Sequence, residues 1–249
     1  MSAERGEPYA IGRARGVKFG ALSPEIASAL PRWIETRHVD GGEELRAGRV
    51  WKYGAWAVKF GGAERLLRSS SALRAARAAM NLRGVPTPRP LVALEWRAGL
   101  HVAGSVLVTE FVHGRALFDV WSSDERAVDA FPLFLHALHA AGVYHGDFHP
   151  ENALWDGERW VLIDLESLKR RAPWRSWSSI AETQWARVLR ALDFDARTPE
   201  LFTRYDTLAR PNVSTAERDA AWSRVELAAR ALPPIPGAKL AEIRARLRG

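Results

Sequence analysis

The first regular pattern of apolar residues in the chain is helical. Ser23 offers a capping hydroxyl, Pro24 suits the first position of a helix, and apolar residues then recur on one face at Ile26, Leu30 and Ile34. The residues before this helix, 1–22, mix glycine, arginine and small side chains without periodicity. We expect them to form a loosely ordered lead-in.

Strand patterns follow the helix. Residues 43–60 predict two or three short strands, the last two joined by a turn at Gly54-Ala55. Residues 63–83 then show helical spacing with a break at Ser69-Ser70-Ser71, and two further strands are predicted at 91–96 and 106–112. This order of elements favours a small antiparallel sheet with a helix inserted into it.

The second half of the chain is mostly helical in its pattern. Helical spacing covers residues 116–141, with a new cap at 122–124, and most of residues 178–231. A stiff proline-rich linker, LPPIPG, then precedes a basic amphipathic segment at 238–248. The fold class expected is α+β, with a lead-in at 1–22, a sheet-rich part at 23–112 and a mostly helical part at 113–249.

The stretch YHGDFHPENALWDGERWVLIDLE, from Tyr144 to Glu166, carries the residues with the clearest chemistry. Asp147 is followed five residues later by Asn152. Phosphoryl transfer requires a carboxylate that orients the acceptor hydroxyl and takes its proton, and oxygen ligands for magnesium. We therefore expect Asp147 to be the catalytic residue and Asn152 to bind the metal.

A second carboxylate follows after a hairpin. Asp156-Gly157 is a strong two-residue turn signal, and it separates ALW from RWVLID. The chain is expected to fold back at this turn and to bring Asp164 beside Asn152. These two side chains would then complete the magnesium site.

These motifs resemble a known family. HGDFHPEN followed by VLIDLE resembles the catalytic and metal-binding loops of kinase-like phosphotransferases, and looks most like the lipopolysaccharide (Kdo) kinase family, with aminoglycoside phosphotransferases as more distant relatives. GVPTPRPL also resembles this family, and the resemblance covers residues 45–170. It implies a two-lobed protein-kinase-like fold that uses ATP and Mg²⁺, with a nucleotide-binding lobe at 23–112 and a helical, catalytic and substrate-binding lobe at 113–249. Gly146 stands where protein kinases usually carry Arg, which favours a small-molecule or glycolipid substrate.

The resemblance also implies which residues bind the nucleotide. Lys59, in the strand pattern WAVKF, matches the lysine that reaches the nucleotide phosphates in kinase-like families. The strand VLVTEFVHG runs into the segment whose backbone pairs with adenine in the family, here Glu110, Phe111 and Val112. The glycine-rich phosphate loop is represented only by Gly48, since no GxGxxG is present.

One departure from the family affects Lys59. The kinase fold pairs this lysine with a glutamate on a helix, but residues 73–83 contain no acid. Glu64 is the only acid in the segment, and its position suits a strand-to-helix turn better than a facing helix. Either another group steadies Lys59 or the activity is reduced.

Two residues are expected to support the site. We expect His145 to pack beneath the catalytic loop and to hold its backbone by a hydrogen bond. Asp164 is followed by Leu165-Glu166 where protein kinases have Phe-Gly, so the carboxylate is kept and the regulatory switch is lost. Glu166 is expected to contact the metal or its ligands.

The net charge of the chain indicates which kinds of binding partner to expect. The chain has 36 Lys and Arg against 29 Asp and Glu, a formal net charge of +7, which favours an anionic partner. We expect ATP and an anionic sugar or glycolipid acceptor, with peripheral contact to an acidic membrane surface, and no nucleic acid. The basic segment LKRRAPWRSW could receive such a group, although a solvated basic loop fits it equally well.

Two alternatives remain open. One is a kinase of another small molecule, such as an aminoglycoside, a choline-like alcohol or another sugar, although the basic segment argues against cationic drugs. The other is a pseudokinase that acts as an interaction module, favoured by the missing helix glutamate and opposed by the intact Asp147, Asn152 and Asp164.

Localisation is expected to be cytoplasmic, with possible contact at the inner face of the cell membrane. The sequence has no apolar run of about eighteen residues, no basic start followed by an apolar stretch, and no cysteine. These features predict neither a transmembrane helix nor a signal peptide.

Overall fold

The structure is a computed structural model and describes residues 6–64 and 68–248. It divides into two compact units, which we call the sheet unit and the helical unit. The sheet unit holds the residues up to Leu82, Thr87–Val112 and the short segment Asp164–Glu166. The helical unit holds Arg83–Pro86, His113–Ile163 and the residues from Ser167 onward.

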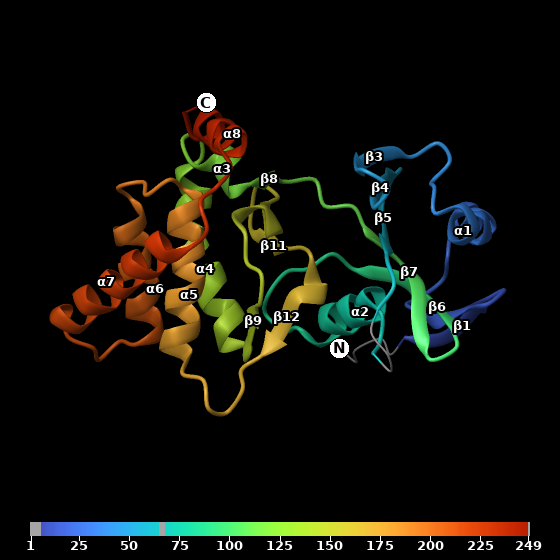
Figure 1. Cartoon of the computed structure of the whole chain (residues 1–249), viewed down its shortest axis with the longest axis horizontal. Coiled ribbons are helices and arrows are strands. Elements are labelled where there is room, and N and C mark those ends of the chain that lie inside the picture. The colour runs from blue at the N-terminus through green and yellow to red at the C-terminus, as the bar shows by residue number, and fades with distance from the viewer. Residues whose placement is uncertain (1–5, 65–67, 249) are drawn as a thin grey trace. The chain divides into compact units, whose positions relative to one another are not determined.

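The sheet unit is built on seven antiparallel strands (Figure 1). Their order in the sheet is β1-β2-β6-β7-β5-β4-β3. The strands are β1 (Glu7–Ile11), β2 (Ala14–Lys18), β3 (Glu43–Arg46), β4 (Val50–Tyr53), β5 (Trp56–Gly61), β6 (Pro90–Ala98) and β7 (His101–Glu110). Neighbouring strands along the chain mostly form hairpins, as the closely spaced strand patterns predict.

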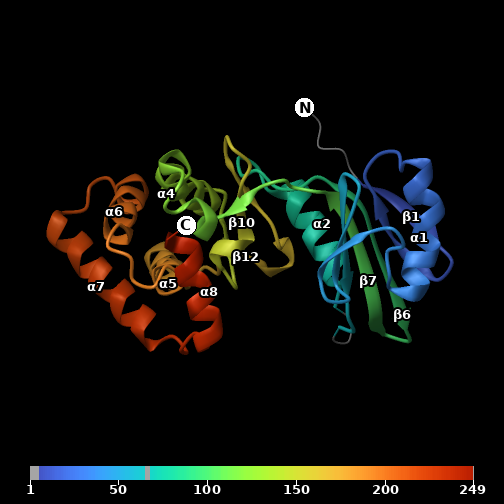
Figure 2. The ribbon, with the colours of Figure 1, turned by 90° about the horizontal axis from the view of Figure 1, so that it is seen from above.

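Two helices, α1 (Pro24–Thr36) and α2 (Ser71–Asn81), lie on opposite faces of this sheet (Figures 1 and 2). One apolar cluster fills the space between α1 and the sheet face that this helix covers, and it includes Trp33 of α1 together with Val58 and Phe60 of β5. Because alternate residues of a strand point to opposite faces, Lys59 points away from this cluster, toward the α2 side. The strand alternation thus places the lysine outside the main apolar core.

The lead-in prediction is wrong for the described part of residues 1–22. This segment forms the β1–β2 hairpin, and β2 pairs with β6 in the register Gly16↔Leu94. A Cβ at Gly16 would lie 2.0 Å from the carbonyl oxygen of Ala93, so only glycine permits this approach. The hairpin pairs with β6 and also packs Ala14, Tyr9 and Ile11 against the apolar cluster. This alternation spans too few residues for a strand pattern to be recognised in the sequence.

The helix predicted over 63–83 is shorter than its pattern. It begins at Ser71, because the Ser70 side chain caps it by accepting from Leu73 N at 3.2 Å. Glu64 instead continues the sheet, since its N–H donates to the carbonyl oxygen of Val102 at 3.0 Å. Residues 65–67 of the prediction lie outside the described part of the chain.

The helical unit contains six α-helices among its described residues. They are α3 (Leu117–Val120), α4 (Glu125–Ala140), α5 (Trp177–Ala191), α6 (Thr198–Ala209), α7 (Thr215–Ala231) and α8 (Gly237–Arg248). Short strands connect them: β8 (Arg115–Ala116), β9 (Val143–His145), β10 (Ala153–Trp155), β11 (Trp160–Leu162) and β12 (Leu168–Arg170). Short 3₁₀ turns lie at Pro150–Asn152 and Leu165–Ser167. An antiparallel sheet unit and a mostly helical unit confirm the α+β fold class.

Aromatic side chains form the centre of the helical unit. Phe131 of α4 packs against Phe148, Trp160 and Trp185, with ring centroids 5.3–6.2 Å apart. Trp160 also donates its indole N–H to the carbonyl oxygen of Ala127 at 2.8 Å, so its polar edge is satisfied inside the core. Several of the eleven tryptophans of the chain are therefore core residues.

The predicted hairpin after Asn152 is confirmed, but its turn is longer than two residues. Trp155 pairs with Trp160, so four residues connect β10 to β11. Asp156 Oδ1 accepts from the backbone N–H groups of Glu158 and Arg159, both at 2.9 Å, and closes the loop. In the described part of the chain, no helix is long and apolar enough to cross a membrane.

Candidate active site

A charged cluster lies on the α2 side of the sheet. The Lys59 ammonium donates to Asp164 Oδ1 and to Glu166 Oε1. The three side chains are 30%, 32% and 20% exposed, respectively. The sheet unit therefore brings together three of the predicted site residues, from segments more than a hundred residues apart in the sequence.

Two carboxylates share one ammonium in this cluster, which affects their protonation. Burial raises the pKa of Glu166, the adjacent Asp164 carboxyl raises it further, and Lys59 opposes this shift. An additional cation would relieve the excess of negative charge. Magnesium is typically held by one or two protein carboxylates together with nucleotide phosphates, and this cluster fits such a site.

No larger protein-only metal site accompanies the cluster. Among residues 6–64 and 68–248, no group of three or more His, Asp and Glu side chains is placed to hold a metal ion. Any ion here would need further ligands from the nucleotide or from neutral side chains such as Asn152.

Glu166 fills the position of the missing helix glutamate as the partner of Lys59. The alternative candidate, Glu64, is engaged elsewhere: it pairs with Arg74 at 2.9 Å and accepts from Ser71 N at 2.7 Å. These contacts fix the start of α2 and leave Glu64 with a structural task. In the described part of the chain, Asp164 and Glu166, and not Glu64, are therefore the carboxylates that contact the Lys59 ammonium.

The predicted adenine-binding segment follows the end of β7. The N–H of Glu110 donates to the carbonyl oxygen of Arg89 at 2.9 Å, and the N–H of Phe111 donates to that of Ala55 at 2.8 Å. Both N–H groups are therefore occupied within the protein. Of the three predicted residues, Val112 is the one whose N–H has no such role among the described residues.

In the helical unit, the loop that carries Asp147 starts from a small sheet. β9 pairs with β12, and Gly146 N donates to the carbonyl oxygen of Ser167 at 2.8 Å. The side chain of Lys169 lies over Gly146, because a Cβ added there would be 2.6 Å from Lys169 Cε. The space that an arginine side chain would need at position 146 is thus already filled.

Two inward-pointing side chains anchor the loop. Phe148 is fully buried, and the buried His145 ring packs edge-on against it at 5.9 Å. The His145 carbonyl oxygen accepts from Gln184 Nε2 at 3.4 Å. His145 therefore lies beneath the loop as predicted, although it is its backbone that receives this bond.

A buried polar chain continues from Gln184. His139 bonds to Gln184 Oε1 through Nε2 and to the Tyr205 hydroxyl through Nδ1 at 2.6 Å. Burial lowers the pKa of His139 to about 4, so the ring is neutral at neutral pH. Because Gln184 donates to His145, its oxygen must face His139, so Nε2 of His139 carries the proton.

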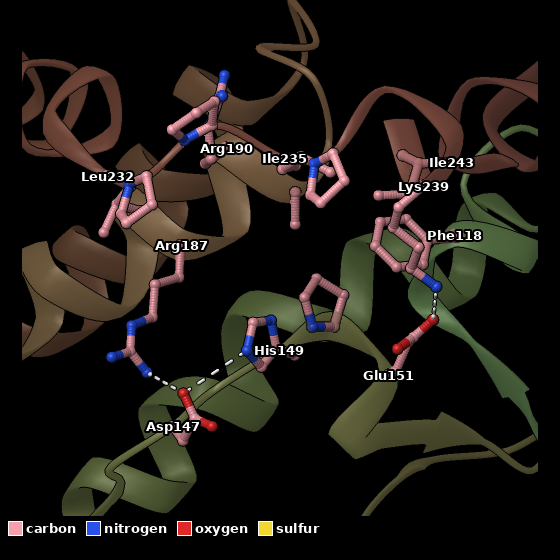
Figure 3. A pocket seen from close by; sticks show the side chains of 15 residues that line it. Phe118, Asp147, His149, Glu151, Arg187, Arg190, Leu232, Ile235, Lys239 and Ile243 are labelled. Atoms are coloured by element: carbon pink, nitrogen blue, oxygen red, sulfur yellow. Dashed lines mark hydrogen bonds and ion pairs between the residues drawn. The ribbon is translucent and has the colours of Figure 1, made fainter. Parts of the chain in front are cut away.

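Asp147 is the exposed residue between these anchors, with 68% of its side chain accessible. Arg187 of α5 donates to Asp147 Oδ1 at 3.2 Å and to the carbonyl oxygen of Gly146 at 3.1 Å. His149 Nε2 lies 3.6 Å from the same carboxylate oxygen (Figure 3). The carboxylate is therefore accessible to a substrate and held on one side by Arg187.

Asn152 is oriented by the same loop. Its Nδ2 donates to the carbonyl oxygen of Asp147 at 3.1 Å. A carbonyl requires a donor, so this contact identifies the amide nitrogen and leaves Oδ1 as the outward oxygen. The predicted metal ligand thus presents the atom that magnesium would need.

A cavity of about 490 Å³ opens beside Asp147 and lies wholly within the helical unit (Figure 3). Its polar groups come from the loop at 147–151, from α5 and from Lys239 of α8, and its apolar wall comes largely from residues 232–236. The size falls within the range of small-ligand sites. This places a candidate acceptor site next to the candidate catalytic carboxylate.

Arg187 and Gln184 are the site residues that the sequence analysis missed. Both lie in the segment predicted only as helical, where polar residues on or near the buried face are the single available signal. Such a signal cannot identify the loop that an α5 side chain contacts, because that depends on tertiary packing.

Comparison with known proteins finds relatives that are described as 3-deoxy-D-manno-octulosonic acid kinases. A 3-deoxy-D-manno-octulosonic acid kinase of Stenotrophomonas maltophilia is 31% identical over 159 residues, covering 59% of this chain and 59% of the relative. One of Xanthomonas oryzae pv. oryzae is 30% identical over 174 residues, covering 66% and 65%. The matches thus span about three fifths of these relatives' own length.

Among solved structures, the bifunctional kinase-methyltransferase WbdD is 18% identical, with a TM-score of 0.41, over 80% of this chain and 47% of that chain. The family model described as "Lipopolysaccharide kinase (Kdo/WaaP) family" matches residues 55–205, which is more than half of the chain and includes every predicted site residue. The chain therefore belongs to the lipopolysaccharide kinase (Kdo/WaaP) family.

Proposed function

We propose that this protein transfers the γ-phosphate of ATP to a hydroxyl of a sugar in lipopolysaccharide or a related glycolipid. The observation that carries the proposal is the contact of Lys59 with Asp164 and Glu166. In kinase-like enzymes, a lysine of the sheet and a carboxylate that binds the metal together position the nucleotide phosphates. Family membership supports the same reaction.

The nucleotide side of the reaction is assigned to the sheet unit. Lys59 binds the phosphates, Glu166 steadies Lys59, and the backbone of Val112 pairs with the adenine. Asp164 of this unit and Asn152 of the helical unit are the residues that would hold Mg²⁺, and the ion would neutralise charge on the phosphates. Residues 23–112 form the proposed nucleotide-binding lobe, and residues 113–249 form the proposed lobe that binds the acceptor.

The acceptor side is assigned to the loop of the helical unit. Asp147 accepts the proton of the attacking hydroxyl, and its exposed carboxylate makes it available for this task. Arg187 orients that carboxylate through its charged contact. His145 supports the loop from the core and takes no part in the chemistry.

The acceptor is proposed from the relatives and from charge. The relatives are named as kinases of 3-deoxy-D-manno-octulosonic acid, a sugar acid. The net charge of +7 and the cationic side chains near Asp147 favour such an anionic acceptor. An aminoglycoside, being cationic, would meet these same charges unfavourably.

The pseudokinase alternative loses its main argument. It rested on the absence of a glutamate partner for Lys59, and Glu166 supplies that contact. An active kinase is therefore the better proposal.

We further propose that the protein touches an acidic membrane surface, where a glycolipid acceptor would lie. Trp174 is 85% exposed and lies between Arg171 and Arg175 in the loop after β12. Exposed indoles flanked by cations suit the membrane interface. Binding to anionic vesicles that is reduced in Trp174→Ala would support this contact, and equal binding would oppose it.

The proposed reaction is tested with ATP labelled at its γ-phosphate, Mg²⁺ and 3-deoxy-D-manno-octulosonic acid or deacylated lipopolysaccharide as acceptor. The expected result is label on the sugar, lost in both Asp147→Ala and Asp164→Ala. Label on no acceptor with the folded parent protein would overturn the proposal.

A further inference from the structure

The cavity beside Asp147 is built partly from residues outside the region that matches the family. The family match ends at residue 205, whereas one wall consists of Leu232–Pro236 and the start of α8. Three of the five residues in Leu232–Pro236 are prolines. Because proline fixes the backbone and has no N–H, this wall is stiff and offers few hydrogen-bond donors.

Ion pairs fix α8 to the catalytic loop. Lys239 contacts Glu151 at 3.1 Å, and Arg246 contacts Glu151 at 3.1 Å and Asp119 at 2.8 Å. Ile243, on the same helix, is only 3% exposed. Glu151 precedes Asn152, so the C-terminal segment is attached directly to the loop that carries two of the proposed site residues.

Not every cationic side chain that lines the cavity has a carboxylate partner in the part of the chain that the structure describes. Arg187 is paired with Asp147, and Lys239 is paired with Glu151. Arg190, one turn further along α5, has no carboxylate partner among the described residues. Its guanidinium carbon lies 5.8 Å from the Phe194 ring centroid, and its Nε is buried without a hydrogen bond.

An unpaired guanidinium in a largely apolar cavity favours an anionic ligand, because an ionic partner would satisfy both its charge and its donors. Arg190 lies near Leu232 and Ile235 of the apolar wall (Figure 3), and such a wall suits the carbon face of a sugar ring. Among the cations that line the cavity, Arg190 is the one that lacks a carboxylate partner in the described part of the chain, and it shares this cavity with the proposed base.

We infer that this cavity binds the acceptor, that Arg190 receives its carboxylate, and that residues 232–236, outside the family match, form the wall that contacts the sugar ring. The inference rests on the proposed function for the identity of the acceptor. It adds that acceptor selection depends on residues that lie outside the family match.

A matched pair of ligands tests Arg190. Binding of 3-deoxy-D-manno-octulosonic acid and of its methyl ester is measured by calorimetry without ATP, so catalysis is not required. The parent is expected to bind the acid about ten-fold or more tightly than the neutral ester, the size of a charge-assisted hydrogen bond. Arg190→Gln should abolish this preference, and Arg190→Lys should restore part of it.

Arg126→Gln is the matched control, since it removes the same charge from an exposed position on α4 outside the cavity. It should leave the preference for the acid unchanged. An equal loss in Arg126→Gln and Arg190→Gln, or no preference in the parent, would overturn the assignment of Arg190.

The wall is tested by filling the cavity. Ile235 is only partly buried, so Ile235→Trp can project into the cavity without disrupting a packed core. Weakening of both acid and ester by about ten-fold or more supports the wall assignment, and unchanged binding of both ligands by a folded Ile235→Trp overturns it. Binding that follows these expectations without any phosphate transfer would reject the proposed function and support the cavity assignment.

Discussion

The two charged regions of the molecule are held in different ways. In the sheet unit, Lys59, Asp164 and Glu166 hold one another through direct ion pairs. In the helical unit, Asp147 is largely exposed, and its loop is held by buried neighbours such as Phe148 and by Gln184. Changing a charge should therefore disturb the first region through its partners, whereas the second should lose chemistry without losing its shape.

The largest effect is expected at Asp147. Asp147→Ala should lower the rate of phosphate transfer by roughly 10²–10⁴-fold, the range for loss of a positioned acid–base group. The melting temperature should hardly change, because the side chain is 68% exposed. Single-turnover kinetics and thermal denaturation together check this, and a large loss of stability would show that Asp147 also has a structural role.

Glu166→Gln should have the next largest effect, on the use of ATP. The substitution removes a charge partner of Lys59, and kcat/KM for ATP should fall by roughly 10–100-fold, as expected for a charge-assisted hydrogen bond. The matched variant Glu64→Gln breaks the pair with Arg74 and should leave the KM for ATP unchanged. Similar kinetic losses in both variants would remove the special role of Glu166.

The buried network behind the loop should make stability depend on pH. Burial holds the pKa of folded His139 near 4, below its ordinary value of 6.5, so the unfolded chain takes up a proton first as the pH falls. The free energy of unfolding should therefore decrease by about 2 kcal/mol between pH 7.5 and pH 5 through this group. Urea denaturation at several pH values measures it.

His139→Asn, which cannot titrate in this range, should show a flatter dependence of stability on pH. A variant that keeps the full dependence would assign it to other groups.

The smallest effect is expected at Gly146. Gly146→Ala would bring a methyl group against the flexible end of Lys169, which can move aside, so the cost should be at most about 1 kcal/mol. The same substitution in a Lys169→Ala background should cost less, and a double-mutant cycle measures the difference. Equal costs in both backgrounds would show that Lys169 does not fill this space.

The elements with strong local signals were predictable. Helix α1 has its capping serine, proline and apolar face in the sequence, and it begins and ends where these predict. The family of the chain was also predictable, because HGDFHPEN and VLIDLE are contiguous motifs. Both predictions rested on residues that lie close together in the sequence.

The features that the sequence did not predict depend on long-range pairing. The β1–β2 hairpin owes its position to its pairing with β6, and its short apolar alternation gives too weak a signal. The roles of Arg187 and of residues 232–236 depend on which helices pack beside the catalytic loop. Glu166 was expected to contact the metal or its ligands, and only the structure shows its bond to Lys59.

The central claim is that Asp164 and Asn152 are the protein ligands of a magnesium-bound nucleotide. Electron paramagnetic resonance of Mn²⁺ with ATP measures ion binding to the parent, Asn152→Ala and Asp164→Ala. We predict that both substitutions weaken binding of the nucleotide-bound ion, because each removes one of the proposed oxygen ligands. Unchanged binding in a folded Asn152→Ala would contradict the account.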